Sequence, residues 1–347
     1  MTSGSHASWP ALLTRLLAGE DLDDATTASA MTAIMEGETS PAQVAGFLMA
    51  LRAKGETADE IAGLVRAMRR YALPVRIDGP LLDTCGTGGD RAGTFNVSTV
   101  AALVAAGAGA TVAKHGNRAA SGRCGSADLL EAWGVVVDLP PPGVEACIRK
   151  IGIGFCFAPV FHPAMRHAMP ARRELGVPTV FNFLGPLTNP AGARHQTIGV
   201  SDAEMAPRIA GVLARLDAEH ALVFHGSDGL DELTSTGPST VWEVRGGEVA
   251  QWTFDPAEHG VATATVDDLR GGDVQANRRI AESVLAGDQG APRDIVLLGA
   301  AAALVAADRV DGWAAGLEAA AGAIDSGAAA RVLDDWVRIS QEQATGS

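Results

Sequence analysis

The chain has 347 residues, which is enough to bury one large α/β core or two unequal domains. Hydrophobic residues make up 47% and charged residues 20%, a mixture typical of a globular protein and not of a disordered one. The formal net charge of −14 argues against a nucleic acid or an anionic membrane as the main partner, because proteins that bind these present a basic face. An anionic metabolite would have to be held by a few local cations or by a metal ion.

The cysteines and the apolar runs restrict the class of protein further. The four cysteines are scattered without a C-x-x-C pair, which disfavours a zinc site or a thioredoxin-like centre. A chain of this length needs no disulfide framework, so the thiols suit a reducing compartment. The first ten residues lack the basic start and apolar run of a signal peptide, and the longest apolar stretch, 295–307, is shorter than the ~20 residues that span a bilayer. We expect a cytoplasmic protein that does not enter a membrane.

The amino-terminal region predicts helices. Ser40 is a cap residue followed by a proline at the first helical position, and Gly55 stops the apolar pattern that comes next. Thr57 and Glu60 form a capping-box pattern before a second amphipathic segment. The apolar residues of the two helical faces are Val44, Phe47, Leu48, Leu51, Ile61, Leu64, Val65 and Met68. No strand pattern interrupts the region, so we expect a small helical domain over residues 1–75.

After Pro74, short apolar runs alternate with helical stretches and glycine-rich joints. The runs predicted as strands are residues 110–114, 135–139, 153–158, 196–200 and 221–225. The helices predicted between them are residues 99–106, 127–133, 144–151 and 203–216. This alternation is typical of a mainly parallel sheet with helices on both faces. Residues 241–244 and 249–254, joined through Gly246 and Gly247, predict a hairpin, and the last 75 residues or so return to helix.

A glycine-rich segment, residues 83–90, carries the first chemical signal. Gly86, Gly88 and Gly89 permit positive φ and a close approach of the backbone to a ligand. The polar residues at the start of the next predicted helix are Asn96, Ser98 and Thr99. Free N–H groups and hydroxyls at a helix start suit an anion. The glycines alone fit a tight turn before an ordinary helix cap equally well.

A second loop, residues 114–128, follows a predicted strand and leads into a predicted helix. Lys114, Arg118 and Arg123 supply the cations that an acidic protein needs if it holds a phosphorylated ligand. The small donors among them are Ser121, Gly122 and Ser126. The loop is not a Walker P-loop, because no Gly-Lys-Ser/Thr sequence precedes the helix. The alternative is a basic surface loop, although three cations so close together, interleaved with Gly and Ser, are unusual in a solvated loop.

Two further segments hold candidate functional residues. Asp231 and Glu232 follow a predicted strand, the place where α/β proteins bind ligands, and an adjacent carboxylate pair suits Mg²⁺. A bare Asp-Glu pair is more often a solvated surface feature, and only its position favours a metal site. A predicted helix within residues 157–173 carries Arg166, His167, Arg172 and Arg173. His162 and His167 do not have the i,i+4 spacing of a helical zinc pair, so we interpret them as structural or substrate-lining residues.

Together these motifs resemble those of the anthranilate phosphoribosyltransferases. The matching motifs are GTGGD at 86–90, NVST at 96–99, KHGNR at 114–118, GSAD at 125–128, FNFLGPLTNP at 181–190 and DGLDELT at 228–234. The match runs from about residue 31 to residue 234, and all the motifs in this order are highly specific. The resemblance implies transfer of the phosphoribosyl group of 5-phosphoribosyl diphosphate to anthranilate, with release of diphosphate, in tryptophan biosynthesis.

The resemblance also implies a role for individual residues. The phosphoribosyl diphosphate site would comprise Gly86, Gly89, Asp90, Thr94, Asn96, Val97, Ser98, Thr99, Lys114, His115, Gly116, Asn117, Arg118, Ala119, Ala120, Ser121, Gly122 and Ser126. The ligands of two Mg²⁺ ions per subunit would be Ser98, Asp231 and Glu232. The contacts to anthranilate would be Gly86, Asn117 and Arg172, with His115 and Pro159 close by. The residues alone do not distinguish Arg172 from Arg166 or Arg173 in that role.

The family is similar in fold to pyrimidine nucleoside phosphorylases. The resemblance therefore implies a small helical domain, residues 1–75 joined by about 175–192, and a large α/β domain, residues 76–347, whose mainly parallel sheet is flanked by helices. It also implies a homodimer formed through the helical part. The apolar helical faces favour the same assembly, because they exceed what a domain this small buries alone.

The sequence departs from the family pattern at three positions. Gly122 replaces a usual serine, Phe161 a tyrosine and Gly299 an asparagine. None of these changes removes a metal carboxylate or the anthranilate arginine.

Two other classes of protein are alternatives to this family. A nucleoside phosphorylase would share the fold but lack the FNFLGPLTNP run and the Asp231–Glu232 pair. A nucleic-acid-binding relative would be basic and would have lost those carboxylates.

The implied reaction indicates what the site must do. Diphosphate is a good leaving group when it is bound to a metal ion, and the ribosyl carbon becomes cationic as diphosphate departs. Electrostatic stabilisation of the leaving group should therefore be the largest contribution to catalysis. The amine of anthranilate is neutral near neutral pH, so we assign no residue as a general acid or base. Placing the amine behind the reacting carbon supplies much of the rest.

Overall fold

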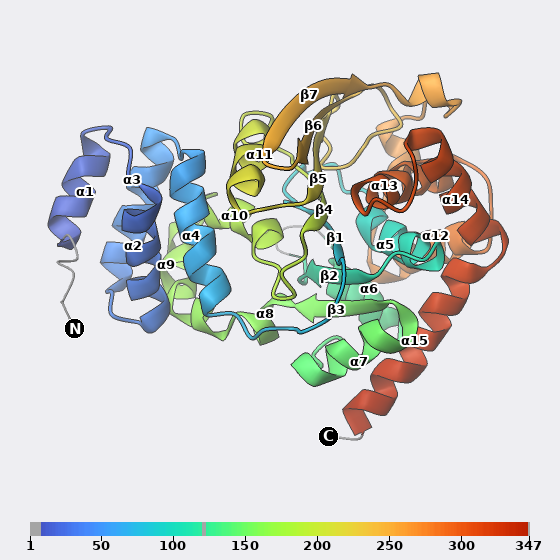
Figure 1. The fold of residues 1–347 in the computed structure, drawn as a ribbon, viewed down its shortest axis with the longest axis horizontal. Coiled ribbons are helices and arrows are strands. Elements are labelled where there is room, and N and C mark those ends of the chain that lie inside the picture. Colours follow the sequence, from blue (N-terminus) through green and yellow to red (C-terminus); the bar gives the residue numbers. More distant parts are fainter. Residues whose placement is uncertain (1–7, 120–122, 346–347) are drawn as a thin grey trace.

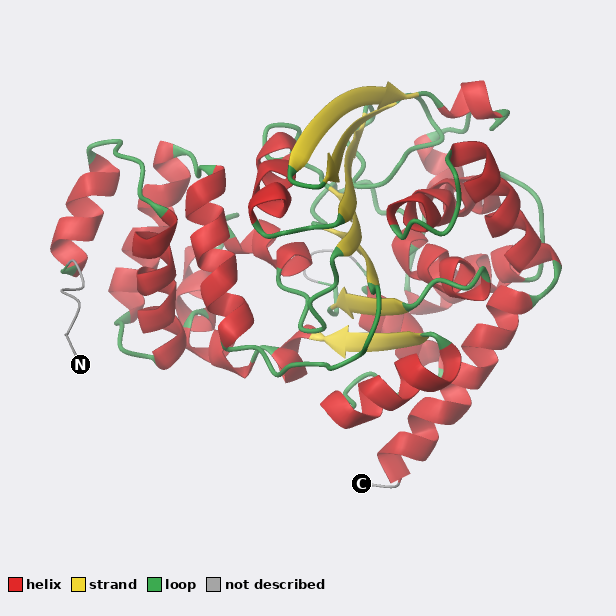
Figure 2. Ribbon diagram, viewed as in Figure 1, coloured by secondary structure: helices red, strands yellow, loops and turns green. Residues whose placement is uncertain are grey.

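The structure, a computed structural model, describes residues 8–119 and 123–345. A group of amino-terminal helices stands beside a larger part built on a seven-stranded sheet (Figure 1). Figure 2 shows the strands in the middle of this larger part with helices on both sides. The predicted fold class, a small helical part joined to a large α/β part with a mainly parallel sheet, is confirmed.

The predicted amino-terminal helices are present, with the predicted caps. They are α1 (Trp9–Leu17), α2 (Asp24–Glu36), α3 (Pro41–Lys54) and α4 (Ala58–Arg70). The Ser40 hydroxyl accepts the Gln43 N–H at 3.3 Å, and the Thr57 hydroxyl accepts the Glu60 N–H at 3.2 Å. In return, the Gln43 and Glu60 side chains accept the N–H groups of Ser40 and Thr57 at 2.8 Å. Both helices therefore begin where local hydrogen bonding dictates.

The apolar faces of α3 and α4 are covered within the chain itself. Val44, Phe47, Leu48 and Leu51 on α3, like Ile61, Leu64 and Val65 on α4, are 0% exposed, and Met68 is 5% exposed. Helices from the large part complete this cover, because α9 packs on α3, and α10 and α11 pack on α4. The small domain therefore does not cover these faces alone, as predicted, but the large part of the same chain completes the cover, so the faces give no argument for a partner subunit.

The sheet has the strand order β3-β2-β1-β4-β5-β6-β7. Its strands are β1 (Leu82–Gly86), β2 (Val112–Gly116), β3 (Ile153–Phe157), β4 (His195–Gly199), β5 (His220–Gly226), β6 (Ser239–Arg245) and β7 (Glu248–Phe254). The first five are parallel, while β6 and β7 are antiparallel and form the predicted hairpin. Gly246 and Gly247 at the hairpin turn have φ values of 58° and 85°, the left-handed conformation that a two-residue turn of this kind requires.

One predicted strand is absent and one strand was not predicted. Residues 135–139 are a short, valine-rich apolar run, but they form no strand. The N–H of Val136 donates to the Ser340 hydroxyl at 3.0 Å, so this segment lies against a helix and pairs with no neighbouring strand. β1 was missed because its Asp83 and its final glycine indicated a loop. The other predicted strands are confirmed with ends shifted by one or two residues.

Helices cover both faces of the sheet. Those of the large part are α5 (Val97–Gly107), α6 (Ser126–Trp133), α7 (Pro141–Ile151), α8 (Ala158–Phe161), α9 (Met169–Leu175), α10 (Phe181–Leu184), α11 (Ala206–Arg215), α12 (Val274–Leu285), α13 (Ala291–Ala306), α14 (Trp313–Asp325) and α15 (Ala328–Thr345). Leu222 and Phe224 of β5 join the apolar cluster under α5 and α13. Ala221 and Val223 point to the other face, into a cluster shared with α11 and the amino-terminal helices.

The connections place a ligand-binding position at the middle of the sheet. The helix that follows β1, α5, lies on one face, whereas α11, which follows β4, lies on the other. β1 and β4 are adjacent and parallel, so their chains separate to opposite faces beyond Gly86 and Gly199. In open α/β sheets, ligands bind outside the carboxyl ends of the strands at such a switch point.

Two further findings concern the class of protein. Within the described ranges, no helix combines the length and apolar character needed to cross a bilayer. Cys85, Cys124, Cys147 and Cys156 are all free thiols.

Glu60 holds the amino-terminal helices together, and its removal should destabilise them. The side chain is 0% exposed, and it accepts the Leu22 N–H at 2.9 Å and the Lys54 ammonium at 3.0 Å. We expect Glu60→Ala to lower the free energy of unfolding by roughly 3 kcal/mol, because a buried cation and two backbone donors lose their acceptor. Urea unfolding measures this loss. Asp59→Ala, which removes an exposed ion pair with Arg215, is the control and should lower the free energy of unfolding by less than ~1 kcal/mol. Equal losses in the two variants would show that the buried Glu60 stabilises the helices no more than an exposed ion pair does.

Candidate active site

Two glycines at the ends of adjacent strands allow a distant loop to lie directly on the sheet. Gly86 ends β1, Gly199 ends β4, and the two residues are paired in register. A Cβ atom at Gly199 would lie 1.7 Å from the carbonyl oxygen of Asp231, and one at Gly86 would lie 2.3 Å from the Asp231 carboxylate. Neither glycine has positive φ, so space alone requires glycine here. The loop after β5 therefore reaches the switch point between β1 and β4.

The same loop is shaped so that its two acids face the switch point. Leu230 and Leu233 are 0% and 1% exposed, and they anchor the loop in the core on either side of Asp231 and Glu232. The Asp228 carboxylate accepts the Leu230 N–H at 3.1 Å, and it also accepts the hydroxyls of two nearby threonines. The apolar-acid-acid-apolar order thus places both acids on one side of a constrained turn.

Each acid also accepts a hydrogen bond from a different segment that was predicted to bind anions. The Gly88 N–H donates to Asp231 at 2.7 Å, and the Ser98 N–H at the start of α5 donates to Glu232 at 3.2 Å. Gly88 has a φ of 68°, which orients its N–H toward the acid at little steric cost. The glycine-rich turn, the start of α5 and the loop after β5 therefore meet at one point, although they are distant in sequence.

Electrostatic repulsion concentrates at this point. Removal from water, with the charge of nearby Asp90, raises the pKa of Asp231 to about 7. Removal from water and the charge of Asp231 raise the pKa of Glu232 well above its usual range, and Lys114 opposes that shift. One carboxylate oxygen of Asp90 is buried without a hydrogen-bond partner. Crowded, half-buried carboxylates with an unsatisfied oxygen fit a divalent cation.

The cation would need ligands beyond the side chains of the protein. Among the residues that the structure describes, no three His, Cys, Asp or Glu side chains lie close enough to form a complete metal site. Mg²⁺ commonly binds through one or two carboxylates, with water and phosphate oxygens filling the other positions. Asp231 and Glu232 therefore suit a cation that arrives together with a phosphorylated substrate.

Lys114 lies beneath the acids. Predicted as the last residue of a strand and the first of the loop motif, it lies in the middle of β2 and is only 2% exposed. Its ammonium group donates to the Thr84 carbonyl and lies 3.5 Å from the Ser98 hydroxyl. Burial raises the pKa of Asp83 to about 6, and the Lys114 charge opposes that rise. Lys114 thus provides positive charge from inside the sheet.

The loop after β2 is closed by its own hydrogen bonds. Asp128 accepts the N–H groups of Ala119 and Gly125 at 3.1 and 2.8 Å, and it pairs with Arg118 at 3.0 Å. Arg118 also pairs with Glu131 at 2.5 Å, so it is less available to a ligand than its predicted role requires. The other predicted residues of this loop divide into Gly116, Asn117 and Ser126, which lie at its two ends, and Ala120, Ser121 and Gly122, which lie outside the described residues.

Two neutral histidines lie beside this loop. The rings of His115 and His162 are 5.1 Å apart, and the Nε2 atom of each is buried without a partner. His115 Nδ1 donates to the Gly185 carbonyl at 2.9 Å, which leaves Nε2 as an acceptor. Burial lowers the pKa of His115 to about 3 and that of His162 to about 4. His167 lies elsewhere, against Gly37, so the two predicted histidines do not form one group.

Arg172 is distinguished from its neighbours by its surroundings. Its guanidinium group lies 4.9 Å from the centre of the Phe181 ring, and burial lowers its pKa. It has no carboxylate within ion-pair distance in the described part of the chain. Arg166 and Arg173 are exposed and line an open hollow of about 430 Å³. Phe181 begins α10, after which Gly185 accepts the His115 hydrogen bond, so Arg172 and the histidines belong to one connected region.

Asn189 connects the FNFLGPLTNP run to the sheet, and we did not predict that role from the sequence. Its side chain is 2% exposed and donates to the Ala113 carbonyl on β2 at 2.7 Å. From the sequence, this asparagine was only part of the matching FNFLGPLTNP motif. An asparagine beside a proline, where the backbone offers fewer donors, was the signal that could have indicated a side-chain tether.

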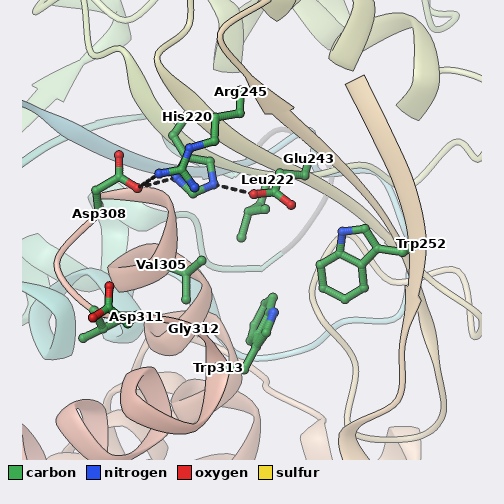
Figure 3. A pocket seen from close by; sticks show the side chains of 11 residues that line it. His220, Leu222, Glu243, Arg245, Trp252, Val305, Asp308, Asp311, Gly312 and Trp313 are labelled. Carbon is green, nitrogen blue, oxygen red and sulfur yellow. Dashed lines mark hydrogen bonds and ion pairs between the residues drawn. The ribbon is translucent and has the colours of Figure 1, made fainter. Parts of the chain in front are cut away.

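A second hollow, of about 360 Å³, lies at the opposite end of β5. Figure 3 shows His220 between Glu243 and Asp308, with Trp252 and Trp313 on another wall. The His220 ring nitrogens lie 2.9 Å from Asp308 and 3.0 Å from Glu243. His220 is the first residue of β5, whereas the acid loop follows the last, so this hollow is separate from the candidate active site.

Comparison with known proteins agrees with this geometry. Residues 10–72 match the helical bundle domain of a glycosyl transferase family, and residues 78–330 match its a/b domain. The anthranilate phosphoribosyltransferase of Arthrobacter sp. (strain FB24) is 56% identical, covering 98% of this chain and 100% of that protein. That of Solibacter usitatus (strain Ellin6076) is 55% identical, covering 91% and 94%.

Solved structures agree as well. The crystal structure of anthranilate phosphoribosyltransferase from Thermus thermophilus has a TM-score of 0.90 and 46% identity, covering 95% of this chain and 99% of that one. The enzyme from Saccharomyces cerevisiae in complex with PRPP and Mg has a TM-score of 0.89 and 29% identity, covering 97% and 99%. The chain therefore belongs to the anthranilate phosphoribosyltransferase family.

Proposed function

We propose that the carboxyl edge of the sheet, between the Gly86 turn and the Asp231 loop, is the active site of the family reaction in this chain. The enzyme transfers the phosphoribosyl group of 5-phosphoribosyl diphosphate to anthranilate, giving N-(5-phosphoribosyl)anthranilate and diphosphate in tryptophan biosynthesis. The observation that carries the assignment is the acid pair held directly on the strand ends beside an anion-binding turn. Incubating the protein with both substrates and Mg²⁺ should consume anthranilate, which the loss of its fluorescence measures.

The phosphoribosyl diphosphate would lie across the β1 turn, the start of α5 and the loop after β2. The residues that we propose to bind it are Gly86, Gly89, Asp90, Thr94, Asn96, Val97, Ser98, Thr99, Lys114, His115, Gly116, Asn117, Arg118, Ala119, Ala120, Ser121, Gly122 and Ser126. Backbone N–H groups at the turn and at the helix start suit phosphate oxygens, and Lys114 adds positive charge below them. Arg118 would contact a phosphate only by giving up part of its pairing with Glu131.

Asp231, Glu232 and the Ser98 hydroxyl are the proposed ligands of two Mg²⁺ ions per subunit. When bound, Mg²⁺ neutralises the diphosphate as it leaves the ribosyl carbon. The yeast relative whose structure contains PRPP and Mg supports magnesium use. The part played by the protein is to hold the carboxylates in fixed positions, since Gly88 and Ser98 already bind one oxygen of each acid.

Anthranilate would lie between Arg172, Asn117 and the backbone of Gly86, with His115 and Pro159 close by. The planar guanidinium group of Arg172 suits the substrate carboxylate, and it forms no ion pair with another acid among the residues that the structure describes. The yeast relative in complex with 4-fluoroanthranilate supports a small aromatic substrate. His115, neutral because burial lowers its pKa to about 3, would accept or direct a hydrogen bond without adding charge. No general base is assigned.

Removing the two acid charges should abolish turnover without unfolding the protein. We expect Asp231→Asn with Glu232→Gln to lower kcat at least ~100-fold, because the metal ions lose their anionic ligands. Thermal stability should not fall, since the two half-buried acids repel each other. Activity measured against Mg²⁺ concentration checks the prediction, with exposed Glu248→Gln as the control. Full turnover of the unmodified protein in EDTA would contradict it.

Replacing Arg172 should weaken use of anthranilate selectively. A charge-assisted hydrogen bond contributes roughly 1.5–3 kcal/mol, so Arg172→Ala should lower kcat/KM for anthranilate by roughly 10- to 150-fold. KM for phosphoribosyl diphosphate should change much less, because its phosphates lie on other segments. Arg173→Ala, which removes the adjacent exposed cation, is the matched control. Normal anthranilate kinetics in Arg172→Ala, or an equal loss of affinity for both substrates, would refute the assignment.

The remaining proposals concern domains, location and assembly. We propose a helical domain of residues 1–75 joined by about 175–192, a catalytic domain of residues 76–347, and a cytoplasmic location. We also propose a homodimer formed through the helical domain. Since the α3 and α4 cores are already covered, the surface left for an interface includes Leu17 on α1, which is 78% exposed, and Met49 on α3, which is 38% exposed. Figure 1 shows α1 on this outer side, away from the sheet.

Sedimentation tests this assembly directly. We expect the unmodified protein to sediment as a dimer at micromolar concentration. Leu17→Glu with Met49→Glu should shift it to a monomer, because two charges would be buried at the interface. Val249→Glu, a charge on an exposed apolar residue of β7, is the control and should leave the dimer intact. A monomer for the unmodified protein would reject the proposal.

A further inference from the structure

Asn277 links the carboxyl-terminal half of the chain to the proposed phosphate site. It lies in the first turn of α12 and is 2% exposed. Its side-chain oxygen accepts the Gly272 N–H at 2.7 Å, and its amide nitrogen donates to the side-chain oxygen of Asn96 at 2.9 Å. Asn96 directly precedes α5, on which Ser98 contacts the acid loop. A residue of α12 therefore bonds to one of the proposed phosphate-binding residues.

The hydrogen bonds run in one direction only. The Gly272 N–H is a donor, so it must face the Asn277 oxygen, and the Asn277 NH₂ group must then face Asn96. Asn96 accepts with its oxygen, which leaves its own NH₂ group to donate to the Cys124 carbonyl at 3.0 Å. The chain of bonds thus extends from α12 through Asn96 to the loop after β2, and it joins the two proposed phosphate-binding segments.

Because of these two hydrogen bonds, the Asn96 side chain does not cap α5. An asparagine in the position before a helix commonly accepts an N–H of the first turn, but the Asn96 side chain makes no such cap bond. Both of its amide groups are occupied by Asn277 and Cys124. The N–H groups at the start of α5 are consequently not capped by the adjacent side chain, and Ser98 N–H meets Glu232 instead.

The backbone around Asn277 is packed too closely to move independently. The Gly271 N–H donates to the Gly93 carbonyl at 2.9 Å, and the Phe95 N–H donates to the Leu269 carbonyl at 3.2 Å. A Cβ atom at Gly271 would lie 2.5 Å from the Asn277 side-chain oxygen and 2.8 Å from Phe95 Cα. The segment before α12 is therefore held against the segment before α5, which fixes the distance that the amide bonds span.

We propose that Asn277 is a positioning residue for the phosphoribosyl diphosphate site. It keeps the Asn96 amide turned toward the loop after β2, so that the start of α5 and this loop, both of which we propose to bind phosphoribosyl diphosphate, keep a constant separation. The inference rests on the proposed function. Without Asn277, the Asn96 side chain keeps only its bond to the Cys124 carbonyl, so the start of α5 and the loop after β2 are held less firmly relative to each other.

Two variants test the two side-chain hydrogen bonds of Asn277, which join it to Gly272 and to Asn96. Asn277→Asp keeps the shape and the acceptor for Gly272 but places an oxygen against the Asn96 oxygen, whereas Asn277→Ala removes both bonds. We expect each variant to raise KM and the dissociation constant for phosphoribosyl diphosphate about 3- to 10-fold, the usual range for one lost hydrogen bond. KM for anthranilate should stay within about twofold. Should Asn277→Ala fail to fold, Asn277→Asp decides.

Ser340→Ala is the matched control. Its hydroxyl, on α15, is also buried and accepts one backbone N–H, that of Val136 at 3.0 Å. It should lower the melting temperature without changing either KM. If the Asn277 variants lose melting temperature in the same way but keep both KM values, Asn277 is merely structural and the proposal is overturned.

A double-mutant cycle tests the route through Asn96. Adding Asn277→Ala to Asn96→Ala should leave KM for phosphoribosyl diphosphate unchanged, because Asn277 has then lost the residue that it positions. Independent effects that multiply in the double variant would overturn the proposal.

Titration of the unmodified protein with phosphoribosyl diphosphate distinguishes failure of the proposed function from failure of the role of Asn277. Absence of binding there would refute the proposed function together with this inference, whereas normal binding by both protein and variants would refute this inference alone.

Discussion

The position of Asp231 on the ends of β1 and β4 depends on two residues that have no side chain. A Cβ atom at Gly199 would overlap the Asp231 carbonyl, at 1.7 Å, and one at Gly86 would meet its carboxylate at 2.3 Å. A close-packed interior does not absorb an overlap of this size without moving a neighbour. Any side chain at either position would lift the loop and separate both acids from Gly88 and Ser98, which bind them.

The electrostatics of the site follow from that close approach. Asp231 and Glu232 are brought beside Asp90 in surroundings that raise the pKa of both, and buried Lys114 only partly opposes the effect. Such crowding is unfavourable by itself, and proteins retain unfavourable local arrangements mainly at functional sites. A divalent cation with a diphosphate would add charges that balance the group. The strongly acidic total of the chain is therefore compatible with an anionic substrate, because the balance is local.

The two apolar clusters explain how the substrates would be separated. The proposed phosphate-binding segments lie at the carboxyl edge of the sheet, over the cluster that includes α5 and α13. Arg172 lies on α9, which packs against α3 in the other cluster, where the helical bundle meets the sheet. The aromatic substrate would thus be held where two parts of the molecule meet, and the phosphates at the carboxyl edge of the sheet within the large part. A change in the packing of the helical bundle would therefore move Arg172 more than it moves the proposed phosphate-binding loops.

Features that depend on neighbours in sequence were predictable, and features that depend on neighbours in space were not. Ser40 and Thr57 determine where two helices begin, because their cap bonds are formed within one turn, and the motif order alone indicated the family. Residues 135–139 have a strand pattern, but no strand lies beside them to pair with. Lys114 belongs to a loop motif, yet a neighbouring strand buries it. The apolar helix faces suggested a partner because part of their cover comes from segments more than a hundred residues away. The hydrophobic pattern and the helix caps depend on residues that are close together in sequence, so the sequence alone determines them. Burial and long-range hydrogen-bond partners depend on residues that come together only in the folded chain.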